Sequence, residues 1–238
     1  MSSPILHILN GQCLYDYFKT HHLFNGDTYI SFNEAMCAGE VTALPFTDSF
    51  IASRPAVHQV TASDYETITL AALAPLLQPH LNDHFNEIHL YFDNDMFCQI
   101  NLLTLLAYLD TRHFKGIVQF HLIHKDFANK DFINSSSLDI QIYALTCTGY
   151  AKLYEQVLIQ KQMPTTLLIP ILQKGISLYL STFDENWEVL NFIKSHQDLS
   201  EQSLVKLLLQ TFKDYGLGDT QYIEVIKKAR ASMACGLS

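Results

Sequence analysis

The sequence predicts an α/β fold, a mostly parallel and open Rossmann-like sheet followed by an all-helical C-terminal part. Two observations carry this prediction. Short apolar segments alternate with segments of helical periodicity along the first part of the chain, which is typical of a parallel sheet with helices on both faces. From Gly149 onward only helical periodicity is present. We therefore expect an α/β domain at residues 1–146 and a helical domain at 147–238 packed on it.

The predicted strands are short segments rich in β-branched, aliphatic and aromatic residues, bounded by turn residues. They are 5–9, 28–32, 87–92, 117–123 and 138–145. The last of them alternates apolar and polar residues, so we expect it to be half-buried. Right-handed crossovers on both faces require the strand order to reverse beside the first strand. Strand two or strand three should therefore be its neighbour.

The predicted helices follow from apolar residues at helical spacing. In the first half, one follows Gly11, one begins near Ser63 as its N-cap and is disturbed by Pro75, and the clearest begins near Asp95. The predicted C-terminal helices are 149–162, 166–181, 184–196, 200–214 and 220–233. An apolar stripe supports their packing on the sheet domain, formed by Leu204, Leu207, Leu208 and Phe212. The connection from 35 to 61 is either functional or contains short helices.

Composition limits the class of protein. The 238 residues are 48% hydrophobic and 16% charged, which is enough apolar material for a sizeable core. The formal charge is −9 and no Lys/Arg run is present, so we expect no nucleic-acid partner, although a local basic face stays open. The five cysteines form no Cys-x-x-Cys pair, and no segment has signal-peptide or membrane-span character. We expect a reduced, cytoplasmic protein without a membrane segment.

A candidate site follows from the predicted sheet, because ligands of open parallel sheets bind outside the carboxyl ends of the strands. Polar residues stand at four such ends, among them Asn10, Glu34 and Asp95. Gly11 would allow a tight turn after Asn10, and Gln99 would reach back from the first turns of its helix. The alternative is that Asn, Asp and Gly mark ordinary strand-to-helix turns, that Asp95 is only an N-cap accepting from the Cys98 amide, and that Gln99 lies on the surface.

Other chemistries have weaker support. The chain contains no G-x-G-x-x-G, no Walker A motif and no G-x-S-x-G elbow, so dinucleotide, P-loop and serine-hydrolase predictions fail. Glu34 and Asp95 form either a paired acid or cation site or two solvated carboxylates. His7, inside the first strand, is better explained as a hydrogen-bonded core residue than as a ligand. We assign no metal ligands, and the sequence names no cofactor.

Several blocks together resemble a known family. They are "LHILNGQ" at 6–12, "NEAMCAGEV" at 33–41, "DSFIASR" at 48–54 and "FDNDMFCQINLLTLLAYL" at 92–109. This set is similar to the bacterial domain-of-unknown-function family eighteen thirty-five over residues 1 to about 125. The positions that fall on its pattern are His7, Asn10, Gly11, Glu34, Gly39, Asp48, Arg54, Asp95, Gln99 and Asn101. The resemblance implies an α/β N-terminal domain and names no reaction.

The chain departs from the family pattern at Gln12, Asn33, Glu40-Val41 and Asn94, so any activity of the family is in doubt here. The resemblance also singles out Arg54, a residue type suited to bidentate binding of carboxylate or phosphate. The alternative for Arg54 is a structural ion pair with Asp48 or Glu34.

Two functions remain in view. The first is a small polar or anionic ligand bound at the carboxyl ends of the strands by Asn10, Gly11, Glu34, Arg54, Asp95 and Gln99. The second is a non-catalytic protein-interaction or regulatory module, favoured by the helical C-terminal part and the absent catalytic motifs. The sequence decides neither whether the protein is an enzyme nor its oligomeric state.

Overall fold

The computed structural model describes residues 4–23, 26–123 and 140–235. Within these ranges the strands form one five-stranded sheet in the order β2-β1-β3-β4-β5. Its strands are β1 Ile5–Asn10, β2 Thr28–Phe32, β3 Glu87–Phe92, β4 Ile117–Ile123 and β5 Ile140–Leu145. The first four strands are parallel, and β5 runs antiparallel to β4 at the edge. The prediction that β2 or β3 neighbours β1 is confirmed, since β1 lies between them.

The two faces of the sheet differ because side chains alternate along each strand. Leu6, Ile8 and Leu90 lie on one face of the sheet, and helices pack against this face in the larger of two buried clusters that contain strand residues. The opposite face carries His7, Leu9, His89, Tyr91 and His121, and helix α1 Gln12–Thr20 covers part of it through Leu14 and Phe18. Helices therefore lie on both faces, as predicted. On this second face, the helix from the first half of the described chain is α1.

The long connection after β2 contains helix α2 Asp48–His58. This confirms the expectation that the connection contains helical structure. The elements that follow are α3 Ala62–Tyr65, η1 Glu66–Leu70, α4 Ala71–Leu77 and α5 Leu81–His84. The predicted Ser63 cap is wrong. Thr61 is the cap instead, because its hydroxyl accepts from the Asp64 amide at 3.1 Å and donates to the Asp64 carboxylate at 2.7 Å. Pro75 lies in the last turn of α4, which ends two residues later.

Helix α6 Met96–Thr111 is the centre of the molecule. Nearly all of its side chains are buried, which is typical of a helix enclosed by structure on every side. One side packs on the sheet through Leu102, Leu105 and Leu106. The other side, with Ile100 and Leu103, belongs to the core formed with the C-terminal helices. This double packing joins the two parts of the chain.

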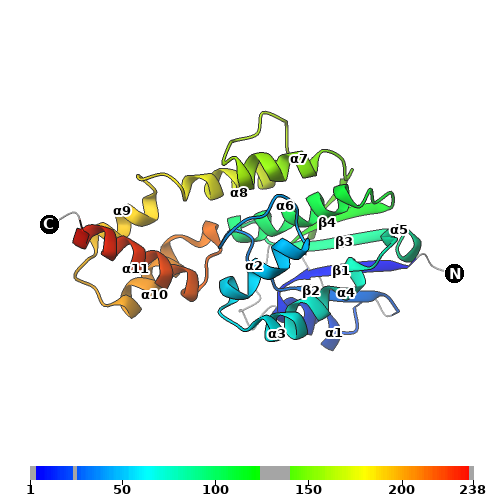
Figure 1. Ribbon diagram of the computed structural model, residues 1–238, viewed down its shortest axis with the longest axis horizontal. Coiled ribbons are helices and arrows are strands. Elements are labelled where there is room, and N and C mark those ends of the chain that lie inside the picture. The colour runs from blue at the N-terminus through cyan, green and yellow to red at the C-terminus, as the bar shows by residue number, and fades with distance from the viewer. Residues whose placement is uncertain (1–3, 24–25, 124–139, 236–238) are drawn as a thin grey trace.

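The C-terminal part is mostly helical, as predicted. Its elements are α7 Tyr150–Tyr154, η3 Glu155–Ile159, α8 Pro170–Ser181, α9 Glu188–Ser195, α10 Glu201–Thr211, η4 Lys213–Tyr215 and α11 Asp219–Cys235. The predicted start of a helix at 166 is wrong, because α8 begins at Pro170, which lacks the amide hydrogen that an interior position needs. In Figure 1, α9, α10 and α11 form the end of the molecule opposite the sheet.

The helical part packs on the α/β part through a shared core. Met36, Phe50 and Ile100 belong to the same buried cluster as Leu204 and Leu208 of the predicted apolar stripe. The expectation that residues 147–238 pack on the sheet domain is therefore supported by this cluster, while the exact boundary at 147 stays a prediction. Within the described ranges, none of the helices combines the length and the apolar character needed to cross a membrane.

Candidate functional site

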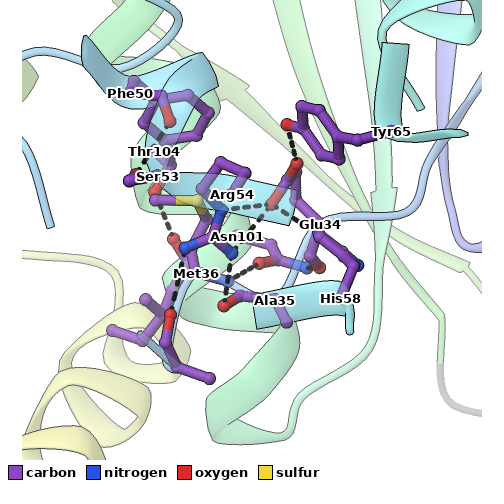
Figure 2. A network of polar contacts seen from close by, with 12 residues as sticks. Glu34, Ala35, Met36, Phe50, Ser53, Arg54, His58, Tyr65, Asn101 and Thr104 are labelled. Atoms are coloured by element: carbon purple, nitrogen blue, oxygen red, sulfur yellow. Dashed lines mark hydrogen bonds and ion pairs between the residues drawn. The ribbon is translucent and has the colours of Figure 1, made fainter. Parts of the chain in front are cut away.

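A buried ion pair stands at the end of β2. The Arg54 Nε atom of α2 donates to Glu34 Oε2 at 2.8 Å, and neither side chain is exposed to solvent. The Tyr65 hydroxyl donates to the other carboxylate oxygen, and His58 Nε2 lies 3.2 Å from Oε2. Figure 2 shows these groups arranged around the Glu34 carboxylate. Of the two partners predicted for Arg54, the structure selects Glu34 rather than Asp48.

The same network fixes the backbone that follows β2. Arg54 donates from Nη2 to the Ala35 carbonyl at 2.9 Å and from Nη1 to the Ala38 carbonyl at 3.0 Å. Asn101 of α6 donates to the Glu34 carbonyl at 2.7 Å and accepts from the Met36 amide at 3.0 Å. The segment is thereby tied to both α2 and α6, as Figure 2 also shows. Arg54 and Asn101 hold the loop in place, and their hydrogen bonds go to protein groups.

The electrostatics of Glu34 reflect the same partners. Burial alone would raise the pKa of this carboxyl, but the bonds from His58 and Tyr65 and the charge of Arg54 together hold its pKa below the usual value. Tyr65 changes in the opposite sense, because burial and the adjacent Glu34 charge raise the pKa of its hydroxyl. Glu34 is therefore a charged hydrogen-bond acceptor and Tyr65 a neutral donor, which suits a structural role for this pair.

A second group forms where β1 ends. Asn10 donates from Nδ2 to the Cys98 sulfur at 2.9 Å, and the Cys98 amide and thiol both donate to Asp95, at 2.7 and 3.4 Å. Asp95 is thus the predicted N-cap of α6. Gly11 has φ 82° and ψ 165°, a conformation that favours glycine, but nothing lies within 4 Å of the position its Cβ would occupy. The predicted tight turn at Gly11 is present.

Helical-part residues cover this second group. A Cβ on Gly216 would lie 2.3 Å from Asp95 Cγ, so the chain after η4 passes directly against the carboxylate. Burial raises the pKa of Asp95 to about 6, although the bonds from Cys98 act in the other direction. Gln99 is fully buried against Gly175 of α8 and donates to the Asp93 carbonyl at 2.6 Å. Its Oε1 has no hydrogen-bond partner among the described residues. The alternative of a surface Gln99 is wrong.

The five predicted site residues with polar side chains therefore fall into separate groups. Glu34 and Arg54 pair with each other, Asn10 and Asp95 meet at the Cys98 side chain, and Gln99 bonds to backbone. Glu34 and Asp95 each have hydrogen-bond partners of their own. Among the described residues, no group of three or more His, Cys, Asp or Glu is arranged to hold a metal ion.

His7 is a buried core residue, as expected. Its Nδ1 lies 3.0 Å from the Tyr91 hydroxyl and its Nε2 lies 3.1 Å from Asp27 Oδ2. His89 and His121 continue this row of rings on the same sheet face. Burial and the two neighbouring histidines lower the pKa of His121 to about 4, so it is neutral at physiological pH.

A large groove lies between the two parts of the molecule, with a volume of about 1520 Å³. One wall is the segment 37–41 after β2 together with α2, and the other comes from α8, α9 and α11. Met96, the first residue of α6, lies in the lining, so the groove borders the segments that follow β2 and β3. None of the six predicted site residues lines it. The Glu34–Arg54 network instead holds the first wall in place, because Arg54 donates to the carbonyl of Ala38 in that wall.

Lys161 is the half-buried cation of the groove lining. Its Nζ donates to the Leu158 carbonyl and to the Tyr179 hydroxyl, each at 2.6 Å. It also lies 4.8 Å from the ring centre of Tyr179 and 4.4 Å from that of Phe183. Lys161 has φ 54°, an uncommon conformation for a residue with a side chain. It forms no ion pair within the described part of the chain.

Comparison with known proteins adds no assignment, since no family model, no curated protein and no solved structure matches this chain. The resemblance to family eighteen thirty-five stays a prediction. Sequence reasoning missed the groove residues Lys161, Tyr179, Phe183 and Trp187. They come from segments distant from the sheet, and the one signal available was that Trp187 is the sole tryptophan.

Proposed function

We propose that this protein binds a small polar or anionic ligand in the groove between its α/β and helical parts, beside the segments that follow β2 and β3. One observation carries the proposal: a half-buried lysine, Lys161, without a carboxylate partner among the described residues, lies in a large groove bordered by both parts. Sites for small molecules are typically concave, mostly apolar and equipped with a few placed polar groups. The proposal assigns binding and no catalytic residue.

The polar residues at the strand ends have a supporting role in this proposal. Glu34 and Arg54 satisfy each other, and Asp95 and Asn10 are bonded to Cys98, so their hydrogen bonds are already made within the protein. Arg54 holds the carbonyls of Ala35 and Ala38, just before or within the groove wall. We infer that these residues fix the shape of the ligand site from behind.

The sole tryptophan provides the test, because Trp187 lines the groove and its fluorescence reports a ligand bound there. Purified protein is screened against nucleotides, sugar phosphates and small organic acids by thermal shift and by Trp187 fluorescence. A ligand present at 100 times its Kd should stabilise the folded state by about 2.7 kcal/mol. We expect both signals to change with the same Kd. The absence of both signals across the panel would overturn the proposal.

Matched variants locate the binding. Ala56→Phe places a ring in the groove from the exposed side of α2, whereas Ala71→Phe places one on an exposed position of α4 outside it. The first variant should weaken binding at least tenfold and the second should leave the Kd unchanged. Equal effects of the two variants would place the ligand elsewhere.

The size of the groove favours a second candidate, a protein-interaction module. Its volume exceeds the 300–1,000 Å³ or so that is typical of small-molecule sites. Phe183 in the lining is 54% exposed, and Ile159 is 40% exposed. If the panel is silent and a purified partner protein protects Phe183 from solvent, the interaction function is supported instead.

The broader setting is part of the proposal. We propose a cytoplasmic protein without a nucleic-acid partner, in keeping with the charge of −9. We also propose that the ligand lies near the carboxyl ends of the strands where the strand order reverses, as in Rossmann-like sheets. The strand order, which reverses at β1, supports that position. Membership of the bacterial family eighteen thirty-five belongs to the same proposal and rests on the residues quoted for it.

A further inference from the structure

Resting on the proposed function, we infer that Lys161 is the anion-binding residue of the groove, and that the ligand is an organic acid with an apolar body. The acid group, whether carboxylate, sulfonate or phosphate, would pair with Nζ. The apolar body would lie along the aromatic side of the groove, where Phe183 is exposed. Hydrogen-bond geometry, aromatic contacts and the charges in the lining carry this inference.

The hydrogen bonds of Lys161 leave room for a ligand. An ammonium group has three N–H donors. Two of them are taken by the Leu158 carbonyl and the Tyr179 hydroxyl, and within the described ranges no third acceptor is bonded to Nζ. These two bonds hold the ammonium group in one place, so a ligand would meet a pre-positioned donor rather than a mobile side chain.

The aromatic contacts favour the charged amine at this position. Nζ lies 4.4 Å from the ring centre of Phe183, and a cation is attracted to the face of an aromatic ring. Its contact with Tyr179 is the hydrogen bond to the hydroxyl. Burial acts against the charge and lowers the pKa of Lys161. An acid group in the groove would offset that burial cost by supplying a counter-charge, so lysine and ligand would stabilise each other.

The charges around the groove support an anion at Lys161 in particular. Lys194 and Lys228 are also in the lining, as are Glu40, Glu185 and Glu224, and all five are exposed. Exposed charges of both signs are screened by solvent and contribute little to binding. Lys161 differs because it is half-buried, so its interaction with an anion is screened less.

The apolar body of the ligand follows from the side chains around the amine. Phe183 is a large exposed aromatic beside Nζ, and Tyr179 and Trp187 complete an aromatic side of the groove. Inorganic phosphate would leave the Phe183 ring in water, whereas an acid with an attached ring or chain would cover it. We therefore expect inorganic phosphate alone to bind much more weakly than such an acid.

Two fluorescent probes with almost the same rings separate the charge from the apolar body. They are 1-anilinonaphthalene-8-sulfonate, which is anionic, and N-phenyl-1-naphthylamine, which lacks the sulfonate. Binding is followed by energy transfer from Trp187, the sole tryptophan, with the folded state checked by circular dichroism. The wild-type protein should bind the sulfonate at least tenfold more tightly than the neutral probe, since bonds to charged groups are among the stronger ones.

The variants assign that preference to one residue. Lys161→Met keeps the unbranched shape and most of the length of the side chain. It should abolish the preference while leaving the neutral probe's Kd within about twofold. Lys161→Arg should retain most of it. Lys194→Met, at an exposed lysine of the same lining, and Lys174→Met, at an exposed lysine outside it, should both leave the preference intact.

The outcomes distinguish the two proposals. If both probes bind with equal Kd, or if Lys161→Met weakens both equally, the anion-binding role is wrong while the groove still binds ligands. If Lys194→Met removes the preference as completely as Lys161→Met, general charge explains it and the inference fails. If neither probe reaches Trp187 and the ligand panel is also silent, the proposed function fails and the inference fails with it.

Discussion

Glu34 at the end of β2 and Arg54 in α2 form an ion pair with both side chains fully buried, 20 residues apart in the chain. The pair joins the sheet to the wall of the groove, because Arg54 also holds the Ala35 and Ala38 carbonyls. Removing two charges from water is costly, so a buried pair is weak evidence for net stability. The loss of one partner has a clearer consequence, because it leaves the other charge buried and unpaired.

Arg54→Met should lower the free energy of unfolding by about 3–5 kcal/mol, because it leaves the Glu34 carboxylate buried without its cation. It also leaves two loop carbonyls without their donors. Urea denaturation followed by circular dichroism measures the loss. The double variant Glu34→Gln/Arg54→Met should be less destabilised than the sum of the two single variants, since the uncompensated charge is gone.

An exposed ion pair provides the control for this measurement. Lys174 and Asp214 are separated by 2.8 Å, but both side chains are about half exposed or more, at 48% and 64%. Lys174→Met should therefore change stability by less than about 1 kcal/mol. A similar loss in both Met variants would mean that the Glu34–Arg54 pair is not desolvated as the structure has it.

Gly39 approaches α2 so closely that a side chain cannot be added without movement. It has φ 79°, and a Cβ there would lie 2.1 Å from Val57 Cγ2. Gly39→Ala should destabilise the protein by about 2–4 kcal/mol, combining backbone strain with overpacking. Thermal unfolding measures the effect. Adding Val57→Ala should recover the overpacking part and leave the strain, so a double variant as unstable as the single one would contradict this contact.

Gly175 of α8 lies directly against Gln99 of α6, and two expectations for its replacement differ in sign. Helix propensity alone predicts that Gly175→Ala stabilises by about 1 kcal/mol. The new Cβ would lie 2.4 Å from Gln99 Cβ, an atom that cannot rotate away. We expect destabilisation by about 1–3 kcal/mol in urea denaturation, because α8 must move from α6.

Gly218→Ala is the matched control for Gly175→Ala. Its φ is outside the left-handed range, and the nearest atom to a new Cβ is the flexible Gln221 Oε1 at 2.9 Å. Stability should change by less than about 1 kcal/mol there. Stabilisation by Gly175→Ala would show that α6 and α8 are farther apart than described.

The sheet could be predicted from the sequence because its signals are local. Strands 28–32, 87–92 and 117–123 have the observed bounds, since each is an apolar segment between turn residues. The Asp95 cap was equally local. The Thr61 cap had a local signal too, because Thr61-x-x-Asp64 has capping-box spacing, but Ser63 has the same kind of hydroxyl.

The groove could not be predicted, because its lining comes from separate parts of the chain. Segment 37–41, α2, Lys161 and α11 meet only through tertiary packing, and no sequence period connects them. The partners of the polar strand ends were hidden for the same reason. Glycine at 175 or 216 gives no local indication that Gln99 or Asp95 will lie against it.

The pKa of Asp95 predicts how stability depends on pH. Burial raises its pKa from 3.8 to about 6, so the folded state holds the proton more tightly than the unfolded state. The stability that this protonation contributes is fully present below pH 3.8 and is lost as pH rises through 6. Asp95→Asn removes the titration and keeps a good N-cap residue. Relative to wild type, the variant should gain about 1 kcal/mol between pH 5 and 7.5 in urea denaturation.

The pKa of His121 is shifted in the opposite direction to that of Asp95, so the two groups have opposite effects on how stability changes with pH. Its pKa is lowered from 6.5 to about 4, so its protonation costs stability as pH falls from 6.5 toward 4. In the wild-type protein the two groups partly cancel over this range, and Asp95→Asn should expose the His121 slope, with stability rising more steeply with pH. His121→Phe keeps a ring against Tyr91 and should flatten that slope. If Asp95→Asn leaves the pH profile unchanged, Asp95 is not shielded from solvent by Gly216.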